Sequence, residues 1–361
     1  MKRLLCIIDS LNVGGAETFL MKLLRTLPKD EYQFDFVVSK DGGAYSSEVL
    51  ARGGRIYTVP PRRKNLMGAL RQIRDTVRTN GYKTVLRLGD EPIVGLDLVA
   101  ARLGGAKKLA FRSCNALAGL SFKSRVLNSV MRPVLNLITD VKIAPSVYAA
   151  EFTFGKSGAR KTHILHNGVD LERFCFSLEG RDGIRQELSL DKRFVVGHIG
   201  RFSKQKNHRF LLEIFKEITM IRGDAMLLLV GGGEDEGLIR EWIKEFDLEG
   251  RVIMAGQRFD IPEILSSMDV FVFPSFFEGM PNTVIEAQAT GLPCVISDTI
   301  TPDADITGLV YYLPLDLSAS EWAEKAVLIS EADRKDTVNV IRMHGYDIED
   351  VAKEFKTLLF D

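Results

Sequence analysis

Cysteine is scarce in this chain of 361 residues. The four cysteines, Cys6, Cys114, Cys175 and Cys294, are scattered and show no C-x-x-C spacing. A disulfide framework or a structural zinc site would need paired or closely spaced cysteines. Cys6 and Cys294 lie in apolar, strand-like runs, where a buried thiol is ordinary. The cysteine usage therefore favours a reduced, cytoplasmic protein without structural zinc.

Long hydrophobic runs are also missing. No apolar stretch approaches the roughly 20 residues that a transmembrane helix needs. The N-terminal run, Met1–Ile8, begins with basic residues as a signal peptide does, but it is short and ends at Asp9. We interpret it as a first strand. The expected location is cytoplasmic, with peripheral contact at the inner face of the membrane as a further expectation.

Several motifs that carry known chemistry are absent. The chain has no Walker A loop, and Gly14-Gly15 does not fit G-x-G-x-x-G, so a dinucleotide site is disfavoured. The five histidines have no metal-ligand spacing, and no Ser/His/Asp arrangement can be assembled. We therefore expect no metal and no cofactor. Taken alone, Gly14-Gly15 fits either a plain βα turn or a loop that faces a phosphate.

The net charge of zero conceals a strong asymmetry between the two halves. Residues 1–167 carry 27 basic and 13 acidic side chains, whereas residues 168–361 carry 21 and 35. A basic half suggests an anionic partner. No recognisable nucleic-acid module is present, so an anionic membrane or a phosphorylated lipid is favoured over nucleic acid. The basic stretch Arg62–Arg78 and the apolar, basic stretch Leu120–Ile138 fit a membrane surface or, equally, core helices.

Strand-like and helix-like stretches alternate along the whole chain, which predicts parallel, doubly wound α/β sheets. The turn signal Asn167-Gly168 and the change of charge sign place a domain junction near 168–175. We therefore expect two Rossmann-like domains, 1–168 and 169–345, followed by a C-terminal segment, 346–361. Ligands of such sheets bind at the carboxyl ends of the strands, so the cleft between the domains is the expected site.

One stretch, Pro274–Gly291, carries the clearest functional signal. It follows the apolar strand Val270–Phe273, forms a glycine-containing loop and leads into a helix. The start of a helix attracts anions, and Glu278 and Glu286 flank this one. Carboxylates suit sugar hydroxyls rather than phosphate, so the pattern fits a ligand that joins a sugar to a phosphate. On the residues alone, an ordinary βα unit with two solvated glutamates remains the alternative.

Cations follow the neighbouring strands of the second half. Arg201 and Lys206 come after the strand Phe194–Ile199, where both could reach one diphosphate. Arg258 follows the strand Val252–Ala255 and is expected at the same rim. A solvated basic turn is the plainer alternative for each of these loops.

Together these motifs resemble the retaining glycosyltransferases of family 4, which have the GT-B fold, and the resemblance covers nearly the whole chain. Its most specific part is the E-x7-E pattern from Glu278 to Glu286. Gly200-Arg201 with Lys206 fits the family's Arg/Lys pair, and Gly14-Gly15 fits its first glycine loop. The sequence of the second half looks like that of the branch that builds bacterial exopolysaccharide and capsule. The segment Tyr346–Phe360 looks like the family's C-terminal helix, which crosses back to the first domain.

The resemblance implies a role for each candidate residue. Arg201 and Lys206 would bind the donor's diphosphate and stabilise the leaving group, Glu278 would hold sugar hydroxyls, and Glu286 would hold the ribose. The donor site would also include the glycine loops and the start of the helix, with the residues Gly14, Gly15, Arg258, Gly279, Met280, Pro281 and Asn282. The family retains anomeric configuration and needs no metal, since Arg and Lys take that role.

One motif departs from the resemblance. Relatives in this branch often carry a histidine-containing run after the strand matching Lys108–Arg112, whereas this chain has Arg112-Ser113-Cys114-Asn115. Arg112 is therefore a catalytic or acceptor-phosphate candidate. The predicted function is transfer of a sugar from a nucleotide-diphosphate sugar, with UDP expected, to a lipid-linked saccharide in exopolysaccharide, capsule or O-antigen synthesis. A non-catalytic sugar-nucleotide-binding subunit is the alternative, and a nucleotide-sugar epimerase is the third hypothesis.

Overall fold

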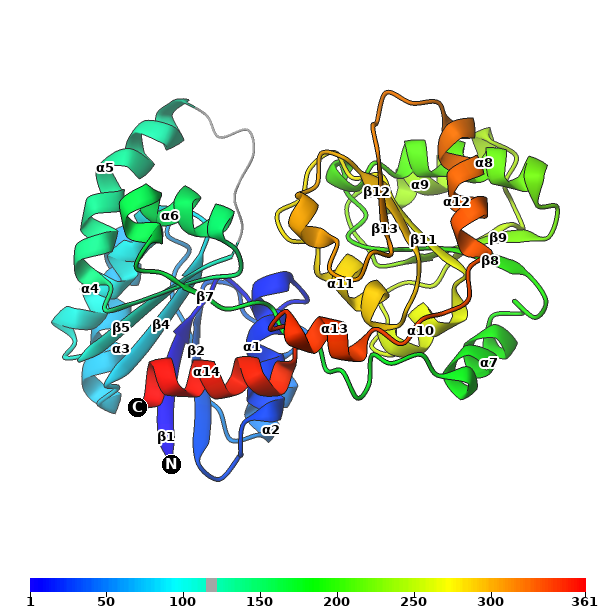
Figure 1. The fold of residues 1–361 in the computed structure, drawn as a ribbon. Coiled ribbons are helices and arrows are strands. Elements are labelled where there is room, and N and C mark those ends of the chain that lie inside the picture. Colours follow the sequence, from blue (N-terminus) through cyan, green and yellow to red (C-terminus); the bar gives the residue numbers. More distant parts are fainter. Residues whose placement is uncertain (115–121) are drawn as a thin grey trace. The chain divides into compact units, whose positions relative to one another are not determined.

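The computed structural model describes residues 1–114 and 122–361 (Figure 1). The predicted motif residue Asn115 and the start of the stretch Leu120–Ile138 lie outside the described residues. The chain forms two compact units. Unit 1 comprises residues 1–168 together with 345–361, and unit 2 comprises residues 169–344.

Unit 1 is built on a parallel sheet of seven strands in the order β3-β2-β1-β4-β5-β6-β7. The strands β2 and β3 lie on one side of β1, and the strands β4 to β7 lie on the other. The direction in which strands are added to the sheet therefore reverses between β1 and β4, which is the topological switch point. The strands are β1 (Lys2–Ile7), β2 (Tyr32–Val38), β3 (Ile56–Thr58), β4 (Thr84–Gly89), β5 (Lys108–Ser113), β6 (Val141–Ala144) and β7 (His163–Ile164).

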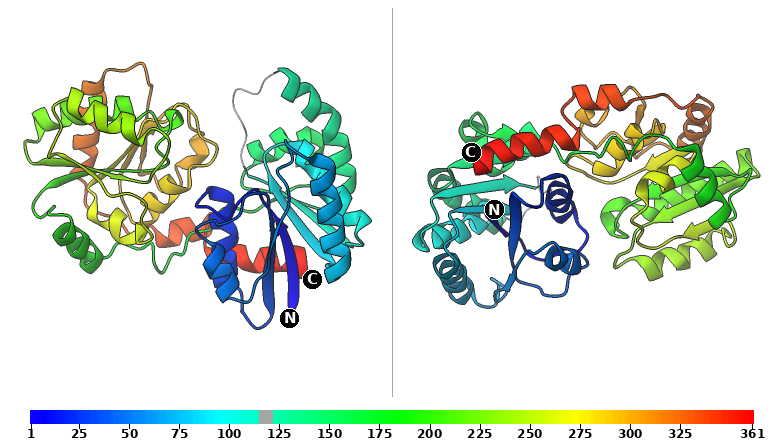
Figure 2. Two further views of the ribbon diagram at one scale, coloured as in Figure 1. Left: turned by 180° about the vertical axis from the view of Figure 1, so that it is seen from behind. Right: turned by 90° about the horizontal axis from the view of Figure 1, so that it is seen from below.

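Helices cover both faces of this sheet (Figure 2). Successive residues of a strand point to opposite faces, so Leu4 and Cys6 enter one core while Leu5 and Ile7 enter the other. The helical elements of unit 1 are α1 (Gly15–Thr26), α2 (Ser46–Ala51), α3 (Leu66–Asn80), η1 (Pro92–Gly95), α4 (Leu96–Leu103), α5 (Phe122–Ile138), α6 (Val147–Ala159) and α14 (Ile348–Phe360).

The C-terminal helix α14 completes the core of unit 1. Phe355 is fully buried and packs edge-on against Phe19 of α1, with ring centroids 6.1 Å apart. It also contacts Phe34 of β2. The last helix is thus part of the same hydrophobic core as the first strand.

Unit 2 contains a second parallel sheet, of six strands in the order β10-β9-β8-β11-β12-β13, whose switch point lies between β8 and β11. The strands are β8 (Phe194–Ile199), β9 (Ala225–Val230), β10 (Val252–Met254), β11 (Val270–Phe273), β12 (Cys294–Ser297) and β13 (Val310–Leu313). The helical elements are α7 (Leu178–Glu187), η2 (Lys204–Lys206), α8 (His208–Ile221), α9 (Glu236–Glu245), α10 (Ile261–Ser267), α11 (Asn282–Ala289), η3 (Pro302–Ala304), α12 (Ala319–Ser330) and α13 (Val338–Met343).

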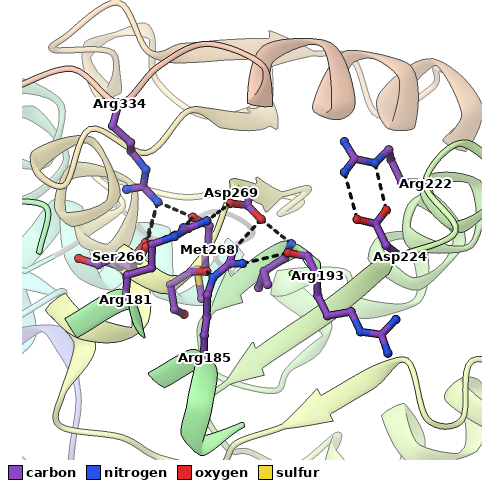
Figure 3. Close-up of polar contacts among 12 residues, drawn as sticks. Arg181, Arg185, Arg193, Arg222, Asp224, Ser266, Met268, Asp269 and Arg334 are labelled. Atoms are coloured by element: carbon purple, nitrogen blue, oxygen red, sulfur yellow. Dashed lines mark hydrogen bonds and ion pairs between the residues drawn. The ribbon is translucent and has the colours of Figure 1, made fainter. Parts of the chain in front are cut away.

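A cluster of arginines fixes the amino ends of the two strands at the switch point of unit 2 (Figure 3). Arg181 and Arg185 of α7 each bind one oxygen of Asp269, at 2.7 and 2.8 Å. Asp269 also accepts the backbone N–H of Val195 in β8 at 2.7 Å. Arg334 donates to the carbonyl groups at the end of α10, where the helix dipole favours a cation. The cluster therefore holds α7, α10 and β8 together.

The structure corrects one expected element. The sequence pattern predicts a helix over Asp333–Met343, but α13 begins only at Val338. The segment before it is tied down by side chains instead: Arg334 binds carbonyls of α10, and the hydroxyl of Thr337 donates to Gln288 at 2.6 Å. These tertiary contacts override the local helical preference. Two short helices, α2 and α7, were not expected from the sequence.

Candidate functional site

The candidate site of unit 2 is built from the two loops that leave the switch point. One follows β8 and runs from Gly200 through η2, and the other follows β11 and runs to the start of α11. Because β8 and β11 are parallel neighbours, their carboxyl ends meet at the same edge of the sheet. This edge is where doubly wound sheets bind ligands.

An ion pair joins the two loops. The Nζ atom of Lys206 lies 2.6 Å from Oε1 of Glu278, and only 14% and 10% of the two side chains are exposed. Lys206 also lies over the ring of Phe273, 4.4 Å from its centroid. The ammonium group is thus fixed by a carboxylate and an aromatic ring at the carboxyl end of β11.

Backbone contacts make this arrangement rigid. The N–H of Phe276 donates to the carbonyl of Gln205 at 2.9 Å, and the Gln205 amide donates back to the carbonyl of Phe277 at 2.8 Å. Glycine is also required at position 231, beside the start of the loop that follows β8: a Cβ there would lie 1.9 Å from the carbonyl oxygen of Gly200, and its φ is +141°. The residues on either side of the Lys206–Glu278 pair are therefore held in place before any ligand arrives.

The start of α11 provides the positive end of a helix dipole beside this pair. Pro281 is the N-cap residue, with no side-chain cap and no acidic residue in the first turn of this described helix. Glu278, Gly279, Met280 and Asn282 are half-buried, and Pro281 is buried. Glu286, in the second turn of α11, is 9% exposed.

The structure does not bring every predicted cation to this pair. Arg201 is 72% exposed at its side chain and binds Glu234 at 2.9 Å. Arg258 is held between Glu187 and Asp260, which raise its pKa. The donor-binding roles of Arg201 and Arg258 stay predictions, and each would require exchange of a carboxylate partner for a phosphate.

Two buried histidines lie beneath the Lys206 loop. His198 of β8 lies 3.0 Å from the carbonyl of Val272 through Nδ1, and because a carbonyl only accepts, Nδ1 carries the proton. Burial, then the neighbouring His208, lowers the pKa of His198 well below its usual value. Burial, then the charge of Lys206, lowers the pKa of His208 to about 4. Both rings are therefore neutral at neutral pH.

In unit 1, the residues Gly14, Gly15 and Arg112 lie near the carboxyl edge of the first sheet. Gly14 is the N-cap of α1 and Gly15 its first residue. Arg112 lies near the end of β5 and is 1% exposed. Its guanidinium carbon lies 3.7 Å from the centroid of the Phe19 ring, and the guanidinium donates a hydrogen bond to Asn167. Burial lowers the pKa of Arg112 to about 10. A buried, stacked guanidinium is better placed to hold the strand edge than to reach a ligand.

No metal site is evident in residues 1–114 and 122–361, because no three His, Cys, Asp or Glu side chains converge there.

The comparisons with known proteins identify the family. Residues 13–173 match the model described as Glycosyltransferase Family 4, and residues 193–331 match the model described as Glycosyl transferases group 1. EpsF of Bacillus subtilis (strain 168), whose name as a glycosyltransferase states neither donor nor acceptor, is 33% identical over 359 residues. That match covers 96% of this chain and 94% of EpsF. The chain belongs to the family 4 glycosyltransferases.

Two further comparisons concern the fold of this glycosyltransferase and a relative whose name states its donor and acceptor. HepE of Anabaena, solved in complex with UDP, superposes with a TM-score of 0.77 at 20% identity, covering 99% of each chain. The fold prediction, two Rossmann-like α/β sheets of the GT-B type, is therefore confirmed. A UDP-Gal:α-D-GlcNAc-diphosphoundecaprenol α-1,3-galactosyltransferase of Escherichia coli is 39% identical over 142 residues, 38% of this chain and 37% of its own.

Sequence reasoning missed some parts of the glycosyltransferase that the structure brings together. It treated His198 and His208 as separate structural residues, but their rings lie 4.9 Å apart under the Lys206 loop. It also missed Asp9, which follows β1 at the switch point of unit 1 and binds two arginines. The position of Asp9 directly after the first strand was the one available signal.

Proposed function

We propose that this glycosyltransferase moves a sugar from a UDP-sugar to a saccharide acceptor, with unit 2 binding the donor and unit 1 the acceptor. The observation that carries the proposal is the Lys206–Glu278 pair at the switch point of unit 2. The pair places a cation that suits a diphosphate 2.6 Å from a carboxylate that suits sugar hydroxyls. The UDP complex of HepE and the UDP-galactose donor named for the Escherichia coli relative support UDP as the nucleotide.

The proposed chemistry needs little more than fixed charges. As the bond between the sugar and the β-phosphate breaks, negative charge develops on the leaving diphosphate. Lys206 would stabilise that charge, assisted by the dipole of α11 and by Arg201 once it leaves Glu234. Glu278 would orient the sugar through its hydroxyls. We propose that the reaction is metal-independent and retains anomeric configuration, with the leaving phosphate taking the proton of the acceptor hydroxyl.

The acceptor proposed here is a lipid-linked saccharide in the synthesis of bacterial exopolysaccharide, capsule or O-antigen. Support comes from the diphosphoundecaprenol acceptor named for the Escherichia coli relative. Both of these relatives, EpsF and the Escherichia coli enzyme, are named as transferases, which gives no support to the alternative of a non-catalytic binding subunit. We therefore retain transfer as the function.

Membrane contact through unit 1 belongs to the same proposal. Among the described helices, none is long and apolar enough to cross a bilayer. The sequence of α5 contains no acidic residue, and one stripe of this helix is apolar and exposed. The stripe consists of Val126, Leu127, Val130, Val134 and Leu137. An apolar stripe on a helix without acidic residues fits an anionic lipid surface.

A transfer assay tests the proposal. Wild-type protein is incubated with a panel of sugar nucleotides and octyl glycosides, with and without EDTA, and the product anomer is read by NMR. We expect release of UDP with formation of a product that keeps the donor's anomeric configuration, undiminished by EDTA. Loss of transfer in EDTA, inversion, or conversion of the donor alone without acceptor would each contradict a stated part of the proposal.

A further inference from the structure

The carboxyl edge of unit 1 contains a charged network that the donor chemistry does not use. Asp9 lies two residues beyond the end of β1 at Ile7, and Arg87 lies in β4, so the two residues stand on either side of the switch point of this sheet. The Nη2 atom of Arg87 lies 3.3 Å from Oδ1 of Asp9, and Nη1 of Arg62 lies 3.0 Å from the same oxygen. Two guanidinium groups thus converge on one oxygen of one carboxylate.

A second carboxylate fixes both arginines independently. Asp97 of α4 is fully buried and accepts from Nε of Arg62 at 3.0 Å. It also lies 2.8 Å from Nε of Arg87, which is 2% exposed. Arg87 donates further to the carbonyl of Ile7 at 3.0 Å. The cations are therefore held by the interior of unit 1 and would keep their positions without Asp9.

The exposure of the two carboxylates is opposite. The Asp97 side chain is 1% exposed, whereas that of Asp9 is 71% exposed. The backbone of Asp9 is also fixed, since its carbonyl accepts the N–H groups of Ser39 and Lys40, each at 3.1 Å. Within the described parts of the chain, every contact of the Asp9 carboxylate uses Oδ1, which leaves Oδ2 to solvent. An exposed carboxylate is normally mobile, but this one is immobilised with one oxygen directed outward.

The neighbouring charges indicate which kind of ligand suits this oxygen. Burial, then the charges of Asp9 and Asp90, raises the pKa of Glu17 at the start of α1. Asp9, Asp90 and Glu17 thus bring carboxylates together at this edge, where a phosphate would meet like charges. A sugar hydroxyl, which is neutral and donates a hydrogen bond, is the ligand that an immobilised carboxylate binds well.

We propose that Asp9, clamped by Arg62 and Arg87, binds a hydroxyl group of the acceptor saccharide and so helps to determine acceptor specificity. This inference rests on the proposed function, since it assumes that unit 1 receives a saccharide. Asp9 contacts the ligand, while Arg62, Arg87 and Asp97 are positioning residues. A carboxylate clamped in this way loses little conformational freedom when it binds, which favours affinity.

Binding of octyl glucoside, octyl galactoside and octyl N-acetylglucosaminide in the presence of UDP tests the proposal directly. NMR titration measures the affinity of wild type, Asp9→Ala and Asp9→Asn for each glycoside, and calorimetry measures UDP. We expect Asp9→Ala to weaken the best-bound glycoside about 10- to 150-fold, as loss of a charged hydrogen bond does, with unchanged UDP affinity. Asp9→Asn should fall between it and wild type.

Asp75→Ala is the matched control, because Asp75 of α3 is also an exposed partner of an arginine, Arg74, at 2.7 Å. It should bind glycosides as wild type does. Equal glycoside affinity in wild type and Asp9→Ala, or no binding of any of the three glycosides by wild type, would overturn the assignment. Parallel loss of UDP affinity would overturn it too. Failure of the proposed transfer would be seen separately, as absent turnover of UDP-sugars by wild type.

Discussion

Replacement of Lys206 and replacement of Glu278 should have opposite effects on nucleotide affinity. In the unliganded protein, Lys206 is neutralised by Glu278 at 2.6 Å, so a donor diphosphate must compete with that carboxylate. Lys206→Met removes the cation and leaves Glu278 facing the diphosphate. Glu278→Gln removes the competitor and leaves the cation available.

The magnitudes follow from the burial of the pair. A charge-assisted hydrogen bond contributes about 1.5–3 kcal/mol, so Lys206→Met should weaken UDP binding about 10- to 150-fold. Glu278→Gln should bind UDP at least as tightly as wild type, yet lose the additional affinity for a UDP-sugar over UDP. Because the two side chains are only 14% and 10% exposed, each variant should also lose about 3 kcal/mol of unfolding free energy, near the lower end for broken buried pairs.

Calorimetry with UDP and with UDP-sugar measures the affinities, and urea unfolding measures stability. Lys204→Met is the matched control, since Lys204 is an exposed lysine in the same turn, η2. It should leave both properties near wild type. Equal weakening of UDP binding in Lys206→Met and Glu278→Gln would refute the reasoning, because it would mean that the pair acts only by holding the fold.

Two further predictions concern stability and membrane contact. The pKa of His208 is about 4 in the folded protein and about 6.5 in the unfolded chain. Between these two pH values the unfolded state binds more protons than the folded state. The free energy of unfolding should therefore fall as the pH drops from about 6.5 to about 4, by at most about 3 kcal/mol. Urea unfolding across this window should show a smaller loss in His208→Leu than in wild type, and identical slopes would contradict the buried neutral ring. For the membrane, Val130→Asp with Leu137→Asp in α5 should reduce co-sedimentation with phosphatidylglycerol vesicles about tenfold or more, since burying each apolar side chain contributes about 1.5–3 kcal/mol. Leu328→Asp, at an exposed position of α12, is the control, and equal sedimentation of the α5 and α12 variants would exclude α5 as the contact.

The sequence was sufficient for the fold because its signals are local. Apolar runs such as Val270–Phe273, which Pro274 ends, predict buried parallel strands, and the structure has β11 over the same residues. Lys206 and Glu278 could be placed near each other because each follows a strand that becomes a neighbour in the sheet. Only the strand order was needed to bring them together.

Features that depend on distant partners could not be predicted in this way. Arg201 and Arg258 looked like free cations along the chain, but Glu234 and Glu187 reach them from elements far away in sequence. The loss of helix before Val338 likewise depends on contacts of Arg334 with α10. A linear pattern reports neither the partner of a charge nor the tertiary bond that replaces a helical one.

The same limit explains why the Asp9 network was missed, and the comparison with the Lys206 pair is informative. Each unit places a cation and a carboxylate together at its switch point, Lys206 with Glu278 in one and Arg87 with Asp9 in the other. In unit 2 the cation is held by that carboxylate, an aromatic ring and a loop, so an incoming diphosphate can replace the carboxylate. In unit 1 a buried second carboxylate, Asp97, keeps the cation occupied, so the exposed Asp9 remains the group presented to a ligand. One arrangement therefore selects an anion and the other a hydroxyl, as the two substrates of a glycosyl transfer require.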